Sequence, residues 1–123
     1  IPNSPLVVNG GSFAPNGFAV TVPQFSGTGG TLNLATGSLT FGSDNTPQTF
    51  AGSVTGAGTV TKVGTGLQTF TGNGSPFSGT TNVTAGELRV NGSLGGTANV
   101  AASSTLSGTG TVVTLSAGGA VSP

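Results

Sequence analysis

A chain of 123 residues is long enough for one ordinary domain and too short for two. It has no His, Cys, Met, Trp or Tyr, and its four charged side chains, Asp44, Lys62, Glu87 and Arg89, sum to zero net charge. The missing imidazole, thiol and acidic clusters exclude the usual nucleophilic, acid–base and metal-dependent sites, so we expect no enzyme, no cofactor and no metal. Two basic residues cannot neutralise a phosphate backbone, which excludes nucleic-acid binding.

Apolar residues recur at a spacing of two, and Gly, Pro or Asn-Gly interrupts them every few residues. This pattern predicts short β-strands and no helix, and the frequent Val, Leu, Phe and Thr favour a folded chain over a disordered one. In chain order, the predicted strands are Leu6–Val8, Phe18–Val22, Thr31–Leu34, Ser38–Phe41, Gln48–Phe50, Thr59–Val63, Leu67–Thr71, Thr81–Val83, Glu87–Val90, Thr97–Val100, Thr105–Leu106 and Thr111–Leu115. We therefore expect an all-β fold, and no apolar run approaches the roughly 18 residues of a membrane-spanning helix.

Short stretches of the sequence recur at an offset of about fifty residues. The matching stretches are 25–28 with 77–80, 35–41 with 84–90, and 56–60 with 108–112. They predict two copies of a repeat, 25–62 and 77–114, within a domain that spans 25–123. Each copy suits about two turns of a solenoid, which makes five or six turns in all. Residues 1–24 lack the repeat and hold four of the seven Pro, so an extended arm or cap is expected there.

The second half of the chain carries a recognisable motif. It runs Gly56-x-Gly58-x-Val60-x-Lys62-x-Gly64-x-Gly66, then Phe70-Thr71-Gly72-Asn73, then Phe77-Ser78-Gly79-x-Thr81-x-Val83-x-x-Gly86-x-Leu88-x-Val90. This text resembles the autotransporter-associated β-strand repeat of bacterial autotransporter passenger domains. Residues 56–123 carry the resemblance well, 25–55 weakly and 1–24 not at all. Two departures are Gln68, where an apolar residue is usual, and residues 74–76, which enlarge a corner.

The resemblance implies a right-handed parallel β-helix at the bacterial cell surface, with no catalytic residue. An antiparallel β-sandwich is the alternative fold, because about a dozen short strands also suit that architecture. We expect a secreted or cell-surface protein, anchored at the outer membrane or part of an extracellular matrix. Its role would be that of a stalk or adhesive segment. Its expected partners are copies of itself, flanking repeats of a longer chain, or a host or matrix surface.

A self-assembling fibre subunit is the alternative function. A short solenoid has unpaired strand edges at both ends, which invite end-to-end stacking or strand addition. The candidate edges carry no charge that would oppose stacking, and they are Leu6, Val7, Val8, Leu115 and Val121.

A few polar residues are candidates for special chemistry. Glu87 and Arg89 are two apart on one predicted strand, so an exposed ion pair is expected. Lys62 could form an intramolecular isopeptide bond with an Asn if Glu87 were buried beside them. Glycosylation sequons begin at Asn73, Asn82 and Asn91. Asn-Gly at the first and third of these is also ordinary turn chemistry, and a bacterial origin predicts that all three are unmodified.

Overall fold

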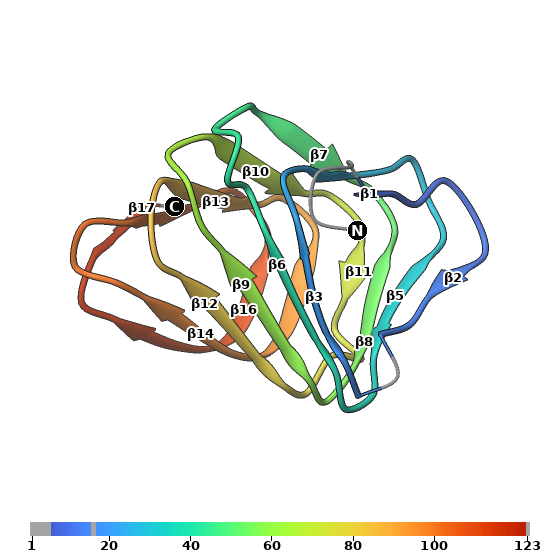
Figure 1. Cartoon of the computed structure of the whole chain (residues 1–123). Helices are drawn as coiled ribbons and strands as arrows, with labels where there is room; N and C mark the ends of the chain where they lie inside the picture. The colour runs from blue at the N-terminus through green and yellow to red at the C-terminus, as the bar shows by residue number, and fades with distance from the viewer. Residues whose placement is uncertain (1–5, 16, 123) are drawn as a thin grey trace.

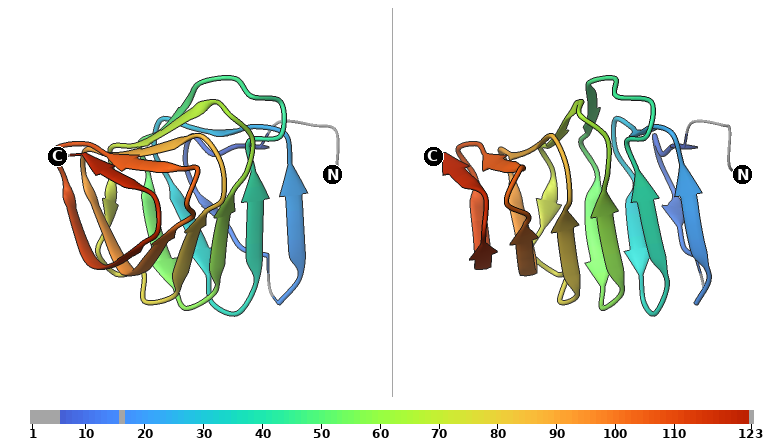
Figure 2. Two further views of the ribbon diagram at one scale, coloured as in Figure 1. Left: turned by 90° about the vertical axis from the view of Figure 1, so that its left-hand side faces the viewer. Right: turned by 60° about the vertical axis from the view of Figure 1, so that its left-hand side comes forward.

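A computed structural model describes residues 6–15 and 17–122, which coil into a β-solenoid (Figure 1). Within these residues every strand pair is parallel and no helix is present. The prediction of an all-β parallel solenoid is therefore confirmed, and the antiparallel sandwich is wrong. Figure 2 shows successive coils stacked side by side, with the first coil at one end and the last at the other.

Three faces run the length of the stack, joined by three corners. Face 1 consists of β1 (Leu6–Val7), β4 (Phe25–Ser26), β7 (Gln48–Phe50), β10 (Leu67–Phe70), β13 (Glu87–Val90), β15 (Thr105–Ser107) and β17 (Ala120–Ser122). Face 2 consists of β2 (Ser12–Phe13), β5 (Thr31–Leu34), β8 (Ser53–Gly56), β11 (Asn73–Gly74) and the first parts of β14 (Ser93–Val100) and β16 (Thr111–Ala117). Face 3 consists of β3 (Ala19–Val22), β6 (Ser38–Phe41), β9 (Thr59–Lys62), β12 (Thr80–Val83) and the second parts of β14 and β16.

One strand from each face makes a layer, and six layers follow one another before β17 starts the next. Layers 1 to 6 comprise residues 6–22, 25–41, 48–62, 67–83, 87–100 and 105–117. On faces 2 and 3, Thr31 lies opposite Ser53 and Thr80 opposite Thr97, so aligned residues are 17 to 22 apart. On face 1 the offsets run from 15, between Thr105 and Ala120, to 23, between Gly27 and Phe50. This stacking agrees with the predicted five or six turns.

The first layer includes most of the segment expected to be an arm or cap. Residues 6–22 form β1, β2 and β3, which pair in parallel with β4, β5 and β6 of the second layer. Residues 1–5 of that segment lie outside the described residues. The boundary expected after residue 24 therefore separates layers 1 and 2 of one continuous stack.

The three sequence matches at an offset of about fifty occupy different corners of the solenoid. Residues 56–60 round the corner between faces 2 and 3, whereas 108–112 round the corner between faces 1 and 2. Likewise, Phe25 lies in β4 on face 1, but Phe77 precedes β12 at the corner of faces 2 and 3. The structural repeat is the single layer, and the predicted copies 25–62 and 77–114 are not equivalent in space.

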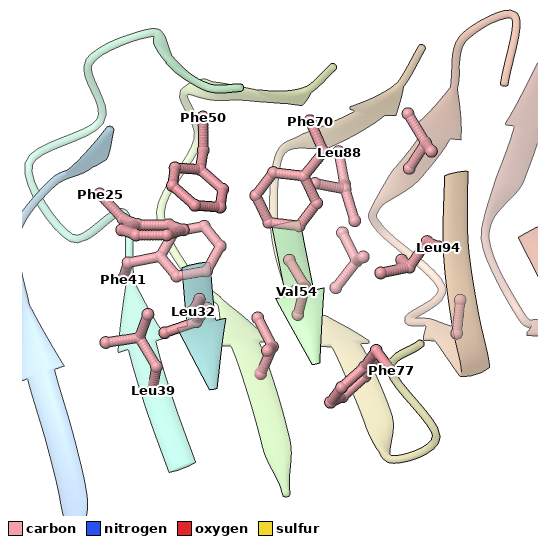
Figure 3. Close-up of a cluster of buried hydrophobic side chains, with 14 of the residues drawn as sticks. Phe25, Leu32, Leu39, Phe41, Phe50, Val54, Phe70, Phe77, Leu88 and Leu94 are labelled. Atoms are coloured by element: carbon pink, nitrogen blue, oxygen red, sulfur yellow. The ribbon is translucent and has the colours of Figure 1, made fainter. Parts of the chain in front are cut away.

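Alternate residues of each strand point inward and fill the core. In β5, β6, β10, β12 and β13 the pattern is strictly one partly exposed residue followed by one buried residue. Four buried rings cluster in layers 2 to 4 (Figure 3). Phe25 is central, with ring centroids 4.5 Å from Phe50, 5.4 Å from Phe41 and 6.3 Å from Phe70. Such ring pairs add stabilisation beyond the area that they bury.

Glycines stack in columns along the three corners. The columns are Gly52, Gly72, Gly92 and Gly110 between faces 1 and 2; Gly37, Gly58, Gly79 and Gly96 between faces 2 and 3; and Gly42, Gly64 and Gly86 between faces 3 and 1. A Cβ on Gly79 would overlap the carbonyl oxygen of Gly58 in the layer before it, so the corner admits no side chain. That same carbonyl accepts a 3.1 Å hydrogen bond from the backbone N–H of Thr80. The recurring Gly-Thr and Gly-Ser text thus marks the places where a corner ends and a strand begins.

Candidate interaction surface

The outward positions of the solenoid carry hydroxyl and amide side chains in rows. On face 3, aligned outward positions form two rows: Ala19, Ser38, Thr59, Thr80 and Thr97, then Thr21, Thr40, Thr61, Asn82 and Asn99. The Asn99 side chain donates a 3.2 Å hydrogen bond to Asn82 Oδ1, one layer away. These uncharged rows offer hydrogen bonds to water on the outside of a rod that has few charged groups.

Charge on face 1 gathers at the outward positions of β13. Arg89 Nη2 lies 3.3 Å from Glu87 Oε2, with the side chains 43% and 33% exposed, which confirms the predicted exposed ion pair. Ser107 of the next layer donates its hydroxyl to the same carboxylate oxygen. A shallow hollow of about 410 Å³ adjoins them, lined by Glu87, Arg89, Asn91, Thr105, Ser107, Gly108 and Thr109. This set, called the β13 cluster below, combines an acid, a base, an amide and hydroxyls.

Asp44 lies apart from that cluster, on the exposed loop between β6 and β7. Partial desolvation raises the pKa of its carboxyl, but hydrogen bonds from Gln24 and Thr46 outweigh that effect and hold the pKa below its ordinary value. The carboxylate accepts the Thr46 backbone N–H at 3.2 Å and the Thr46 hydroxyl at 2.8 Å. Asp44 is therefore a turn-forming residue.

Lys62 ends β9 with its side chain directed inward and only 1% exposed. Its Nζ donates to the carbonyl oxygens of Val63, Gly64 and Ala85. No Asn is among these partners, and the Glu87 carboxylate is bonded to Arg89 and Ser107 on the outside of face 1. An isopeptide bond needs Lys62, an Asn and Glu87 buried together, and these side chains are not arranged so. The isopeptide hypothesis is therefore wrong.

Because Lys62 is buried, the free energy of unfolding is expected to vary with pH in the alkaline range. Desolvation lowers the pKa of its ammonium from the ordinary 10.5, so the folded chain releases this proton at a lower pH than the unfolded chain does. Between those two pH values the unfolded chain binds more protons, so the free energy of unfolding is expected to rise with pH. Urea titrations from pH 7 to pH 11 measure this rise, and Lys62→Met is expected to abolish it. Arg89→Ala, at an exposed site, is expected to keep it.

Asparagines at the corners bond to the next layer. Asn9, Asn45 and Asn91 each accept a backbone N–H, from Thr28 at 3.0 Å, Thr65 at 2.7 Å and Thr109 at 3.2 Å. The side-chain oxygen of Asn73 accepts the hydroxyls of Ser75 and Ser93. The sequon residues Asn73, Asn82 and Asn91 thus all hold bonds between layers, a role that the sequon pattern did not predict.

Two further residues were missed or only flagged by sequence reasoning. Gln68, the departure from the repeat motif, is 3% exposed, and its amide donates a 2.9 Å hydrogen bond to the Phe25 carbonyl, two layers away. Phe18, predicted to begin a strand, is 73% exposed at the corner between faces 2 and 3. The Gln68 amide is tolerated in the core because it is hydrogen-bonded there.

The five predicted assembly edges differ in accessibility. Val8 is buried and Leu6 packs against the core, so neither presents a free apolar edge. Val7, Leu115 and Val121 are exposed, at 54%, 42% and 48%. Leu115 and Val121 lie together at the C-terminal end of the stack, around a hollow also lined by Val90, Leu106, Ser107, Gly108, Thr109, Gly110 and Val112.

In residues 6–15 and 17–122 there is no helix long and apolar enough to cross a membrane. The same residues contain no group of three or more side chains suited to hold a metal ion.

Comparison with known proteins links this solenoid to a bacterial adhesin. No family model and no solved structure matches the chain. The chain is 40% identical over 111 residues to the adhesin BmaC autotransporter of Brucella suis biovar 1 (strain 1330), and the match covers 82% of this chain and 3% of that protein. Assignment to the particular β-strand repeat family stays a prediction, whereas the expected bacterial cell-surface location is supported. The chain is a parallel β-solenoid similar in sequence to a small part of an autotransporter adhesin.

Proposed function

We propose that this chain is a non-catalytic, adhesive segment of a bacterial cell-surface protein. The observation that carries the proposal is the 40% identity to the autotransporter adhesin over 82% of the chain. The outer surface supports it, because rows of hydroxyl and amide groups on a rod offer many hydrogen bonds to another surface without charge attraction. A chain with four charged residues and zero net charge also supports a structural role over a catalytic one.

Within the rod, the β13 cluster is the proposed contact site for a host or matrix surface. Arg89 and Glu87 are partly exposed and already fixed in position by each other and by Ser107, so contact with a partner orders few further rotamers. The adjoining hollow has room for a partner side chain or hydroxyl group. Asn91, held by Thr109, contributes an amide whose orientation is fixed.

Adhesion of beads coated with the chain tests this proposal. Coated beads are expected to attach to host cells or matrix-coated wells several-fold more than uncoated beads. Attachment is expected to weaken but to persist between about 0.05 and 0.5 M NaCl, because salt screens the partly exposed Glu87 and Arg89 but not the hydroxyl and amide contacts. A double variant, Glu87→Ala with Arg89→Ala, is expected to attach several-fold less. Asp44→Asn, which removes an exposed charge elsewhere, is the matched control and is expected to attach normally.

Equal attachment of coated and uncoated beads would reject the adhesive role and leave that of a spacer. Sedimentation velocity of the purified chain in solution tests the alternative of self-association through Leu115 and Val121. The similarity to an adhesin does not support that alternative, and a single monomer boundary at all concentrations would contradict it.

A further inference from the structure

Lys62 occupies an inward position that is apolar in the neighbouring layers. Along face 3 the aligned residues are Val22, Phe41, Lys62, Val83 and Val100. All five are buried. A lysine in such a column is destabilising unless its ammonium is fully bonded. The hydrogen-bond partners of Lys62 therefore show which backbone groups stabilise a buried cation.

Three carbonyl oxygens surround the Lys62 ammonium. Nζ lies 3.1 Å from the oxygen of Val63, 3.1 Å from that of Gly64 and 3.3 Å from that of Ala85. An ammonium has three N–H donors, so each donor finds one carbonyl. A neutral amine has two donors, and its lone pair would face the third oxygen. The geometry thus matches the charged form.

No carboxylate completes this site. The two acidic side chains of the sequence, Asp44 and Glu87, are bonded to Gln24 and Thr46 and to Arg89 and Ser107, respectively. Backbone dipoles alone face the ammonium among the described residues. Rings of backbone carbonyls are the means by which proteins replace the hydration shell of a monovalent cation.

The backbone itself arranges these carbonyls. Val63 and Ala85 each precede a glycine in the left-handed region, Gly64 at φ 74° and Gly86 at φ 68°. The φ angle of a residue orients the peptide group before it, so these two glycines set the direction of two of the three carbonyls. A Cβ on Gly86 would lie 2.9 Å from Lys62 Nζ, so glycine also leaves the room that the ammonium fills. The site is a property of the corner, and Lys62 fills it.

We propose that the corner between faces 3 and 1 at layers 3 to 5 is a monovalent-cation site made of backbone carbonyls, with the Lys62 ammonium as its tethered occupant. Shortening Lys62 then leaves a site for a free primary alkylammonium ion. Because Val63 and Gly64 follow layer 3 and Ala85 follows layer 4, the occupant ties successive corners together. In a stack whose layers contact mainly their neighbours, this tie couples the two halves of the rod.

Chemical rescue of Lys62→Ala tests the site. The alanine keeps Cβ and removes three carbons and the nitrogen, which is the heavy-atom set of n-propylammonium. Adding n-propylammonium chloride is expected to raise the unfolding midpoint of Lys62→Ala by several degrees and to saturate, as ligand binding to the folded state does. Tetramethylammonium chloride at equal concentration, which has no N–H donor, is expected to give no such rise. Wild type, in which the ammonium occupies the site, and Lys62→Met, in which the side chain fills the space that the propyl chain would need, are the matched controls and are expected not to respond.

An equal response of Lys62→Ala and the controls, or no response, would overturn the proposal. The wild-type chain supplies a second measurement that needs no variant, since Lys62 is its single lysine. After selective ¹⁵N-lysine labelling, one side-chain ammonium signal is expected at neutral pH, with protons that exchange slowly with water. A rapidly exchanging or neutral amine would also overturn the proposal, even if Lys62→Ala fails to fold.

Discussion

Phe25→Ala is expected to lower the free energy of unfolding by about 3–5 kcal/mol, the usual cost of removing a buried aromatic ring. Phe25 is 0% exposed, and its ring contacts those of Phe41, Phe50 and Phe70. These rings come from layers 2, 3 and 4, so one truncation loosens half of the stack. The cavity cannot close easily, because ladder hydrogen bonds fix the spacing of the layers around it.

Phe18→Ala is the matched control, since it deletes the same ring from a site that is 73% exposed. Its expected effect is within about 0.5 kcal/mol, as for other surface substitutions. Urea-induced unfolding followed by circular dichroism gives both values. Amide hydrogen exchange shows which layers are destabilised in each variant. Phe25→Ala is expected to raise exchange most in layers 2 to 4. Similar losses for the two variants would show that the ring cluster is not the centre of the core.

Much of the fold could be predicted from the alternation of apolar and polar residues. The alternation in Thr31–Leu34, Ser38–Phe41 and Glu87–Val90 depends only on the strand period, and the structure places strands at those same residues. The two-residue strands β2, β4 and β11 escaped prediction because two residues carry no periodic signal. The four-residue strand β8 was also missed, because Val54 is its one apolar residue and shows no alternation. Alternation alone suits a sandwich equally well, so the stacked turns were predicted from the internal repeat and the parallel β-helix from the resemblance.

The repeat period could not be derived in the same way. A Gly followed by Ser or Thr starts strands after two different corners, as at Gly58-Thr59 and at Gly110-Thr111. Both places need a residue without Cβ against the layer before, so the same text arises for the same steric reason. Matching such text pairs unlike corners, which gave an offset of about fifty residues where aligned residues of successive layers are 15 to 23 apart.

The candidate sites differ in how far sequence could reach them. The Glu87–Arg89 pair followed from a spacing of two along a strand, and its geometry was as expected. The partners of Lys62 are backbone carbonyls, which have no sequence signature of their own. The left-handed conformation of Gly64 and Gly86 directs two of the three carbonyls, and conformation at glycine is not readable from the residue type.

Gly79→Ala is expected to destabilise the chain by about 3 kcal/mol, the upper part of the range for overpacking. The added Cβ would overlap the Gly58 carbonyl oxygen and lie 2.7 Å from the carbonyl carbon of Ala57, both backbone atoms of the layer before. Backbone cannot rotate away as a side chain does, and the Gly58 carbonyl also accepts the Thr80 N–H at 3.1 Å. Relief of the overlap therefore separates layers 3 and 4 at that corner and weakens this hydrogen bond.

Gly10→Ala is the matched control for this prediction. Its added Cβ would meet no atom within 4 Å, and the substitution removes conformational freedom from the unfolded chain. It is expected to leave stability unchanged or to raise it by about 0.5 kcal/mol, which reverses the sign of the effect at Gly79. Urea midpoints of the two variants separate steric exclusion at the corner column from a general intolerance of alanine. Equal midpoints would contradict the glycine column as the device that sets the approach of successive layers.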